Sequence, residues 1–367
     1  MQLIFILFFG GMLIQCLFII LFLLAFGKKR SPIDGSEVPI SVIVAAHDEL
    51  DNLKELIPLL LAQEYPSFEV IVVEDRCNDE SFDYLREESK RDARLRVVRV
   101  ASKPDHVNGK KFALTLGIKA AVNDWVLLTD ADCRPNSSLW IKEISKRCAE
   151  NKDFVLGYSP YQKEKGFLNS FIRYESLLTA IQFIGLAILG KPYMGVGRNL
   201  AYRKSLFLDS KGFHDHLSVT GGDDDLFVNQ HATSSNTEVV FGENSIVTSI
   251  PKTTWVEFYV QKVRHLSVGK HYKATDRMLL GLFSISLIAS WALLVPVALL
   301  FPIVYVVFGV FLIRWVLLSI LTHKASRKLG YAFEGWKAPF LDFIFVIYYL
   351  VTGLVALQTK KVRWKKT

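Results

Sequence analysis

Long apolar runs near both ends of the chain restrict its possible folds more than any other feature. The first run, from Leu3 to Phe26, contains no charged residue and is long enough to cross a bilayer as a helix. Lys28-Lys29-Arg30 follows directly, whereas a signal peptide carries its positive charge before the apolar core. Residues 1–30 are therefore expected to form an uncleaved transmembrane anchor. The positive-inside rule then places residue 31 onward in the cytoplasm.

A second apolar region lies toward the C-terminus. Its first block, 278–321, has no charged residue before Arg314 and is interrupted by two prolines, so it fits two spans joined by a tight turn. Its second block, 338–357, has basic residues on both sides, including the tail 360–366. Either this block is re-entrant or interfacial, or the charge rule fails once. Residues 276–367 are thus expected to form a membrane region with two to three transmembrane or re-entrant helices.

The net charge and the cysteine content indicate which classes of partner the protein can bind. The net charge of +8 is concentrated near the membrane boundaries, where each Lys or Arg gains about 1 kcal/mol from anionic headgroups. This placement favours a membrane partner over nucleic acid, so no nucleic-acid partner is expected. Arg314 and Asp342 lie near predicted span ends, so the spans are expected to lack buried charges that mark a transport path. The four cysteines show no metal or disulfide spacing, and free thiols are expected.

The region between the anchors, residues 31–275, alternates between two sequence patterns. Short apolar, β-branched runs alternate with helical stretches, which predicts a parallel sheet covered by helices on both faces. Ligands of such sheets bind at the carboxyl ends of the strands. The expected strands are 38–45, 68–73, 95–100 and 125–128, and the expected helices are 51–63, 79–91 and 110–121.

Acidic residues follow three of these strands. Asp130-Ala131-Asp132 comes after the fourth strand, Glu49 after the first and Asp75 after the second. Mg²⁺ in proteins takes one or two carboxylates and shares its other positions with water and substrate phosphates. The pattern therefore indicates chemistry on a nucleotide diphosphate. The alternative is a set of solvated turn aspartates, since Asp favours turns.

A lysine lies between two of these acidic clusters in the sequence. Asn108-Gly109-Lys110-Lys111 opens the helix before the fourth strand, and a lysine at a helix N-terminus can meet a phosphate or an acidic neighbour. An ordinary loop with solvated lysines is the alternative. The segment 167–189 also has two readings, as a buried core helix or as an amphipathic helix on the bilayer.

The ordered motifs resemble those of the family 2 glycosyltransferases, inverting enzymes with the GT-A fold. The resemblance rests on residues 39–49, 73–79, 108–110 and 130–132, in that order. Downstream, Gly221-Gly-Asp-Asp-Asp-Leu226 resembles the family's acidic acceptor motif, and Gln261-Lys-Val-Arg264-His265 resembles its Gln-x-x-Arg-Trp motif. The resemblance covers roughly residues 38–270. It implies a GT-A, Rossmann-like nucleotide-sugar-binding domain flanked by transmembrane helices.

On the donor side, the resemblance implies a role for each matched residue. Asp75 matches the residue that contacts base and ribose, and Glu49 resembles an acidic residue near the ribose. Asp130 and Asp132 match the metal-associated pair, with Asp132 as the direct ligand of a divalent cation, Mg or Mn. Lys110 completes the expected donor-binding set.

On the acceptor side, Asp224 aligns with the catalytic base. Three consecutive aspartates leave the register open, so Asp223 and Asp225 remain alternatives. Arg264 matches a residue near the leaving diphosphate, and Gln261 one near the acceptor. His265 stands where polymerising synthases carry Trp, whose broad face stacks on a sugar ring, so a single transfer is favoured over polymerisation.

The expected function follows from the resemblance together with the anchors. It is the transfer of a hexose from a nucleotide-diphosphate donor, a UDP-sugar, to a lipid or lipid-linked acceptor in cell-envelope synthesis. The protein is expected in the bacterial inner membrane as a multi-pass protein with its catalytic domain in the cytoplasm. One alternative is a processive polysaccharide synthase. A second is a non-catalytic, nucleotide-binding component of a membrane transport system.

Overall fold

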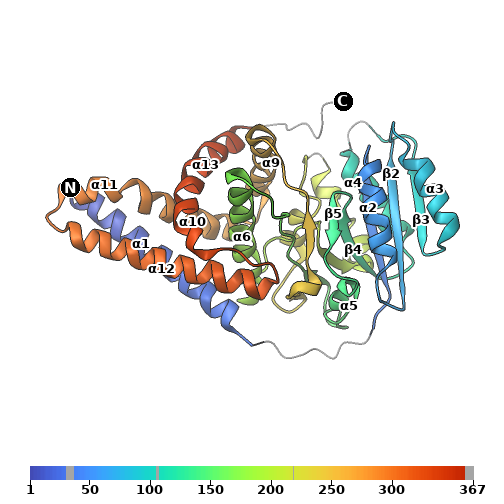
Figure 1. Ribbon diagram of the computed structural model, residues 1–367, viewed down its shortest axis with the longest axis horizontal. Coiled ribbons are helices and arrows are strands. Elements are labelled where there is room, and N and C mark those ends of the chain that lie inside the picture. Colours follow the sequence, from blue (N-terminus) through green and yellow to red (C-terminus); the bar gives the residue numbers. More distant parts are fainter. Residues whose placement is uncertain (30–36, 105–106, 218, 360–367) are drawn as a thin grey trace.

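The computed structural model of the chain describes residues 1–29, 37–104, 107–217 and 219–359. Long helices form one end of the elongated molecule and a strand-rich domain forms the other (Figure 1). The expectations about Arg30 and the basic tail 360–366 fall outside the described residues. All four cysteines are free thiols, as expected.

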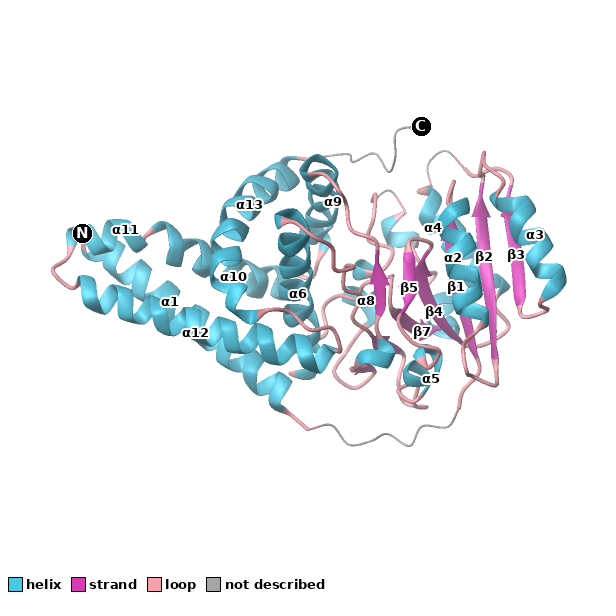
Figure 2. Ribbon diagram, in the orientation of Figure 1, coloured by secondary structure: helices cyan, strands magenta, loops and turns pink. Residues whose placement is uncertain are grey.

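The strand-rich domain is built on a mixed sheet of seven strands in the order β3-β2-β1-β4-β7-β6-β8 (Figure 2). β1 pairs in parallel with β2 and β4, and β2 pairs in parallel with β3, which confirms the predicted parallel core. β7 runs antiparallel to β4 and β6. The strands are β1 (Ile40–Ala46), β2 (Phe68–Asp75), β3 (Leu95–Val100), β4 (Trp125–Asp130), β5 (Cys133–Pro135), β6 (Phe154–Leu156), β7 (Leu200–Arg203), β8 (Thr237–Val239) and β9 (Val247–Ser249), and β5 pairs with β9 in a separate sheet.

Helices cover both faces of this sheet, and the remaining helices form the other end of the molecule. The three helices predicted between the first four strands all form, as α2, α3 and α4. The helices are α1 (Gln2–Gly27), α2 (Leu50–Leu61), α3 (Ser81–Arg91), α4 (Gly109–Ala120), α5 (Trp140–Ser145), α6 (Phe167–Ile188), α7 (Lys204–Asp209), α8 (Asp225–His231), α9 (Trp255–Val268), α10 (Ala274–Ala292), α11 (Leu294–Leu300), α12 (Val304–Leu329) and α13 (Ala338–Gln358).

Alternation along the strands explains the two covered faces. Side chains of successive strand residues point to opposite faces of a sheet. In β1 and β2, Ile43 and Ile71 belong to the cluster that includes α4 and α6, whereas Val42 and Val70 pack with α2 and α5. Both sets are fully buried. The central strands therefore read as continuous apolar runs, which is typical of a parallel sheet buried on both sides.

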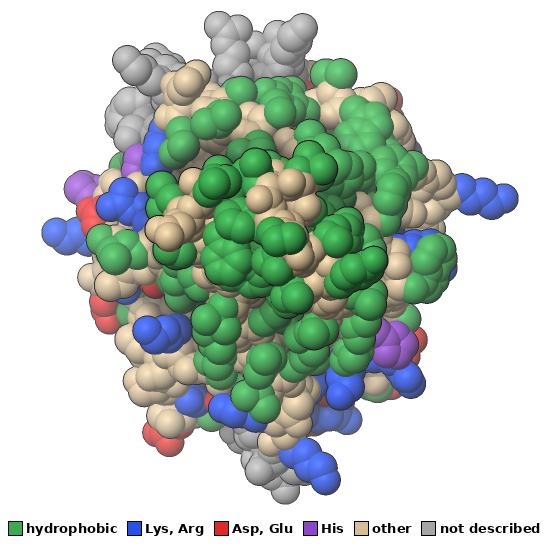
Figure 3. Space-filling view, turned by 90° about the vertical axis from the view of Figure 1, so that its left-hand side faces the viewer, with side chains coloured by type: hydrophobic (Ala, Val, Ile, Leu, Met, Phe, Trp, Pro, Cys, Tyr) green, Lys and Arg blue, Asp and Glu red, His purple; other side chains and the backbone are tan. Residues whose placement is uncertain are grey.

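Several helices are long and apolar enough to cross a membrane. Among the described residues, α1, α6, α12 and the stretch 335–358 containing α13 each pass this test of length and composition, and the bent pair α10–α11 is a further broken span or re-entrant loop. The end of the molecule formed by these helices presents gathered hydrophobic side chains, with most Lys and Arg side chains around its edge (Figure 3). α1 and α12 run along the long axis, whereas α6, α9 and α13 run across it (Figure 1).

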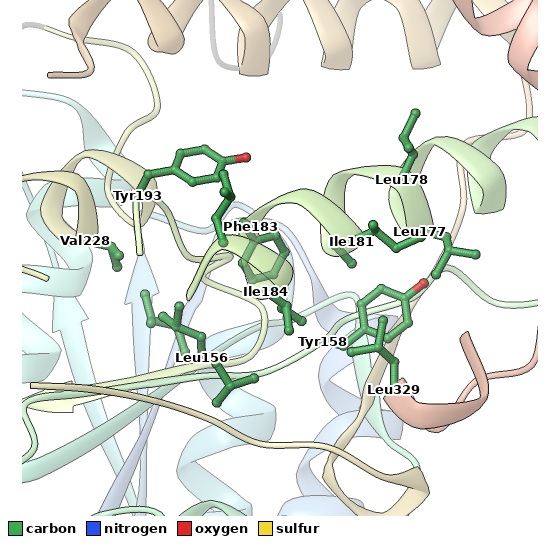
Figure 4. Close-up of a cluster of buried hydrophobic side chains, with 14 of the residues drawn as sticks. Leu156, Tyr158, Leu177, Leu178, Ile181, Phe183, Ile184, Tyr193, Val228 and Leu329 are labelled. Carbon is green, nitrogen blue, oxygen red and sulfur yellow. The ribbon is translucent and has the colours of Figure 1, made fainter. Parts of the chain in front are cut away.

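Helix α6 belongs to the core that joins the two ends of the molecule. Most of its side chains are buried, including Phe171 and Tyr174. It packs on one side against strand residues such as Leu156 and on another against Leu329 of α12 (Figure 4). An added Cβ at Gly185 would lie 2.7 Å from the Phe22 ring of α1, so the backbone of α6 packs directly against that side chain. Of the two readings of this segment, the structure favours the buried core helix.

The expectation about charges in the apolar helices is wrong for Arg314 and Asp342. Both side chains are almost completely buried, and Arg314 Nη1 donates to Asp342 Oδ2 at 2.8 Å. Trp291 of α10 and Tyr174 of α6 donate to the same carboxylate, and Arg314 Nη2 donates to Gln15 of α1. The hydropathy pattern predicted both residues near the ends of spans, because hydropathy contains no information about an ion-pair partner on another helix. Neither residue lines the large cavity described below.

Candidate active site

One cavity of about 1010 Å³ lies between the sheet and the apolar helices. Its walls come from the loops after β1 and β4, the end of β2, the start of α4, and parts of α6, α9, α10 and α13. The structure brings every predicted site residue to this cavity. They are Glu49, Asp75, Lys110, Asp130, Asp132, Asp223, Asp224, Asp225, Gln261 and Arg264.

The sheet register explains why the strand-end carboxylates meet. Ala45 of β1 pairs with Asp130, the last residue of β4, and Ala46 pairs with Glu74 of β2. Asp75 is the last residue of β2. These strands are parallel neighbours, so their carboxyl ends lie at one edge of the sheet and deliver Asp75 and Asp130 to the same wall.

Lys110 connects this wall to the aspartate triplet. The Asn108 side chain caps α4 by accepting the Lys111 N–H, which fixes Lys110 in the first turn. Lys110 Nζ lies 2.9 Å from Asp130 Oδ1 and 3.3 Å from Asp223 Oδ2. Burial lowers the pKa of Lys110, but the carboxylates of Asp130, Asp223 and Asp224 raise it more, and the net shift is upward. Lys110 therefore meets acidic neighbours and is not a solvated loop lysine, and it stays protonated.

Asp130 and Asp132 differ in their electrostatic environment. Burial raises the pKa of Asp130, but Lys110, Arg198 and Arg264 together lower it more, so that carboxylate stays ionised. Burial and the charge of Asp130 raise the pKa of Asp132. Among the described residues, the hydrogen bonds to the Asp132 carboxylate are limited to one long contact of 3.6 Å from the Cys133 thiol. Asp132 thus lies next to another carboxylate and accepts no strong hydrogen bond from the residues that the structure describes. Such a carboxylate is suited to bind a hard divalent cation.

A second group of potential metal ligands is less suited to bind a cation. Within the described part of the chain, Asp48, Cys77 and Asp79 are the group of three whose donor atoms lie within 4.8 Å of one another. Asp48 accepts the Asn78 N–H, and Asp79 accepts two backbone N–H groups. Burial raises the pKa of Cys77 to about 12, and a protonated thiol is a poor metal ligand. The two aspartates satisfy backbone N–H groups across and within the two adjoining loops, after β1 and after β2.

The three consecutive aspartates have three different environments. Asp223 pairs with Lys110, and Asp225 Oδ2 accepts the Tyr272 hydroxyl at 2.8 Å. Asp224 caps α8, because its Oδ1 accepts the Asp225 N–H at 2.8 Å, and its Oδ2 accepts the Gly197 N–H at 2.6 Å. Asp223 and Asp225 are buried, whereas Asp224 is only partly buried. Asp224 is therefore the most accessible of the three from the cavity.

Burial and like charges perturb this triplet. Burial raises the pKa of Asp224, and the neighbouring Asp223 raises it further. Burial and Asp224 raise the pKa of Asp225 well above the ordinary aspartate value. A carboxyl whose pKa moves toward neutrality is suited to accept and release a proton near neutral pH.

Helix α9 contributes the last predicted residues. The Thr254 side chain caps this helix by accepting the Glu257 N–H. Gln261, Arg264 and His265 are spaced by three and four residues, so they share one helix face. All three line the cavity, and His265 is exposed within it.

Sequence reasoning missed two cavity residues. Arg198 lies with its guanidinium carbon 4.5 Å from the centre of the Tyr161 ring, and its buried Nη1 has no hydrogen-bond partner within the described part of the chain. Its segment, 195–199, contains two glycines before the arginine. Tyr272 reaches Asp225 from a distant part of the sequence. An arginine beside glycines was a visible signal, but nothing in the sequence marked Tyr272.

Comparisons with known proteins agree with the family resemblance. The sequence model described as "Glycosyl transferase family 2" matches residues 41–209. The chain is 28% identical over 124 residues to the uncharacterized glycosyltransferase EpsJ of Bacillus subtilis, which is 34% of each protein. It is 24% identical over 209 residues to the glycosyltransferase AglE of Haloferax volcanii, covering 56% of this chain and 65% of that protein. The chain therefore spans about a third of EpsJ, and 21% of the next relative, a Rickettsia felis glycosyltransferase.

A solved structure is similar to this chain over almost its whole length. It is the mannosyltransferase PcManGT from Pyrobaculum calidifontis in complex with GDP-Man and Mn²⁺. The two structures superpose with a TM-score of 0.62 at 16% sequence identity, covering 96% of this chain and 97% of that one. This likeness confirms the predicted fold class, a GT-A sheet domain with apolar helices at both ends of the chain.

Proposed function

We propose that this chain, which belongs to the family 2 glycosyltransferases, transfers one sugar from a nucleotide-diphosphate donor to a lipid or lipid-linked acceptor. The observation that carries the proposal is the single cavity. It joins the carboxylates at the sheet edge to the apolar helices α10 and α13. A water-soluble donor and a membrane-embedded acceptor can therefore meet in one space.

The donor is proposed to bind at the sheet edge. Asp75 and Glu49 would hold the nucleoside, and the Asp75 carboxylate is oriented by two hydrogen bonds from Arg76, at 2.8 and 3.0 Å. The structural relative was solved with GDP-Man, and the family resemblance suggested a UDP-sugar. The proposal is therefore limited to a nucleoside diphosphate sugar, with the base left to experiment.

A divalent cation, Mg²⁺ or Mn²⁺, is proposed to bind Asp132 with help from Asp130. The relative that contains Mn²⁺ and the sparsely bonded Asp132 carboxylate both support this assignment. Such an ion would neutralise charge on the departing diphosphate. Arg264 lines the same cavity, and its fixed positive charge would supply a further part of this stabilisation.

Asp224 is proposed to accept the proton of the attacking hydroxyl. Two backbone N–H groups, from Gly197 and Asp225, fix the orientation of its carboxylate and leave one lone pair on each oxygen. Asp223 is held by Lys110 and Asp225 by Tyr272. These contacts support Asp224 as the base, with Asp223 raising its pKa and with Asp223 and Asp225 in positioning roles. A single inverting displacement needs no nucleophilic side chain.

Transfer by the full-length protein in sealed membrane vesicles tests the proposal. Vesicles would be incubated with UDP- and GDP-sugars and a membrane lipid extract, and labelled lipids identified by mass spectrometry. We expect transfer of a single sugar, dependent on a divalent cation and abolished by chelation. Because nucleotide sugars do not cross bilayers, a cytoplasmic site predicts activity in inverted vesicles and none in right-side-out vesicles. Absence of transfer and hydrolysis with every donor would refute the proposed function.

A further inference from the structure

The cavity extends beyond the carboxylates into an apolar part between α10 and α13. Leu280 and Leu287 line it from α10, and Leu350 and Leu354 line it from α13. Several rim residues are exposed in the isolated chain, among them Leu354 at 60% and Leu357 at 72%. Exposed apolar walls on helices of this hydropathy face lipid rather than water when the protein is in a membrane. With these helices in a bilayer, the apolar part of the cavity would open toward lipid.

Two glycines leave space in this apolar part. A Cβ added at Gly281 of α10 would meet no atom within 4 Å, and one added at Gly353 of α13 would meet only Tyr349, at 4.0 Å. By contrast, a Cβ at Gly11 of α1 would lie 3.3 Å from Ser286 of α10. The glycine at that contact serves close helix packing. Gly281 and Gly353 instead border open space that an alkyl chain can occupy.

Two cations lie where the apolar part meets the polar part. Arg277, in the first turn of α10, and Lys270 both line the cavity. Arg277 Nη1 donates to the Lys270 carbonyl at 3.3 Å, and Lys270 Nζ donates to the Thr359 carbonyl at 3.0 Å. Within the described residues neither cation has a carboxylate partner. Tyr272, between them in sequence, donates to Asp225, so the segment that carries this pair also contacts the aspartate triplet.

We infer that the acceptor is a lipid with a phosphate in its headgroup, bound with its chain between α10 and α13 and its phosphate at Lys270 and Arg277. The inference rests on the proposed function and specifies its acceptor. Along α10, Arg277 precedes the apolar stretch that ends at Ile288, a helical length of about 16 Å. From Tyr272, which donates to Asp225, the chain passes Arg277 and then the apolar wall of α10. This order matches an amphiphile that carries hydroxyl, phosphate and hydrocarbon in the same sequence.

In this arrangement, every bond and proton of the transfer step is accounted for. A headgroup hydroxyl oxygen forms the new bond to the anomeric carbon of the donor sugar. The bond from that carbon to the diphosphate oxygen breaks, and its electron pair leaves with the nucleoside diphosphate. The hydroxyl proton passes to Asp224. The lipid phosphate takes no part in bond making and serves only to anchor the headgroup at the two cations.

Acceptor selectivity tests the inference on the full-length protein in detergent. Four probes would be compared at saturating donor. Phosphatidylglycerol and a prenyl diphosphate-linked sugar both carry phosphate and hydroxyl, whereas diacylglycerol and a free prenol carry only a hydroxyl. We expect kcat/KM at least about tenfold higher for one of the phosphate-bearing probes, the scale of a charge-assisted contact. Which of these two is used identifies the lipid class. Equal or better use of the neutral probes would overturn the inference while leaving the transferase function intact.

Matched variants locate the two parts of the binding site. Lys270→Gln and Arg277→Gln should raise the acceptor KM about tenfold, and Arg277→Lys should restore most of the loss. Lys273→Gln is the control, because Lys273 is outside the cavity lining and its Nζ donates to the Gln230 carbonyl. An equal effect of Lys273→Gln would mean that these cations act only through general attraction to the membrane surface, which contradicts a defined phosphate site.

The chain-binding part is tested by filling it. Gly281→Leu and Gly353→Leu place a side chain into open space, so they should obstruct the lipid without clashing with the protein. We expect a large rise in acceptor KM, with the donor dissociation constant measured on each variant to show that the sheet domain is folded. Gly309→Leu in α12 is the control, since its Cβ also meets nothing within 4 Å and it does not line the cavity. Unchanged acceptor KM in both cavity variants would place the lipid elsewhere.

Discussion

At the scale of single residues, the environment gives three adjacent aspartates different properties. Asp223 and Asp225 each have a strong side-chain partner, whereas the Asp224 carboxylate accepts two backbone N–H groups. We predict that Asp224→Asn lowers kcat by about 10²- to 10⁴-fold, the usual contribution of a general base. Donor affinity, measured by titration calorimetry, should change little. Asp215→Asn, at an exposed aspartate outside the cavity, is the control. A near-native rate for Asp224→Asn would show that another group takes the proton.

The raised pKa of Asp224 gives a prediction for pH dependence. A general base works as the carboxylate, so activity is present above its pKa and is lost as the pH falls through it. Burial and Asp223 raise this pKa, and the acid limb of kcat/KM should therefore lie above the ordinary aspartate value of about 3.9. Asp223→Asn removes a charge that raises the pKa and should move the acid limb to lower pH. A limb that stays in place or moves upward would argue against Asp224 as the titrating group.

At the residue scale, the sequence predicted the location of a side chain correctly where its place at the end of a strand determined its place in the fold. Asp75 and Asp130 end adjacent parallel strands, so their convergence followed from the predicted sheet. The pairing of Lys110 with Asp223 and of Tyr272 with Asp225 depends on how distant segments cross. No local pattern encodes such crossings. The catalytic roles assigned through the resemblance stay predictions.

At the scale of elements, close packing of α4 on the sheet positions Lys110. A Cβ added at Gly117 would lie 2.7 Å from Ile43 and 2.9 Å from Val73. Gly117→Ala should therefore force the helix away from the sheet and cost about 1–3 kcal/mol of unfolding free energy, as overpacking does. The measurement is chemical denaturation in detergent followed by tryptophan fluorescence.

The control for this prediction is Gly10→Ala in α1, where an added Cβ meets nothing within 4 Å. Alanine is favoured over glycine within a helix by at most about 1 kcal/mol, so this variant should be neutral or slightly more stable. Equal destabilisation of both variants would mean that the cost at Gly117 does not come from the contact with the sheet.

Element prediction from sequence succeeded for long periodic segments and failed for short ones. The four predicted strands and the three helices between them formed because β-branched runs alternate with amphipathic stretches. β5 and β9 have three residues each, which is too short for a period to be read. The place of α6 stayed open in the sequence because its apolar residues alternate irregularly with charged ones. Its burial is decided by neighbours on both sides.

At the scale of the whole molecule, one buried ion pair connects helices from both ends of the chain. Arg314–Asp342 and its hydrogen-bond partners involve α1, α6, α10, α12 and α13. Arg314→Leu should cost about 3–5 kcal/mol because it leaves a buried carboxylate without its guanidinium. The double variant Arg314→Leu/Asp342→Leu should recover much of that loss. Thermal unfolding in detergent measures both.

The matched control is Arg327→Leu, at an exposed arginine on the same helix, which should have little effect on stability. If the single and double variants at Arg314 are equally destabilised, the loss comes from packing volume rather than from the unpaired charge.

The position of α6 has a practical consequence for handling the protein. Its apolar side chains lie in one continuous core with the sheet on one side and α1, α12 and α13 on the other. A shortened version ending near residue 275 would uncover that core along its length, and we expect it to precipitate rather than yield a free-standing soluble enzyme. Under the proposed function, this shared layer would hold the reacting groups at a constant height above the lipid tails. Detergent choice and bilayer thickness should therefore influence turnover as directly as substrate concentration does.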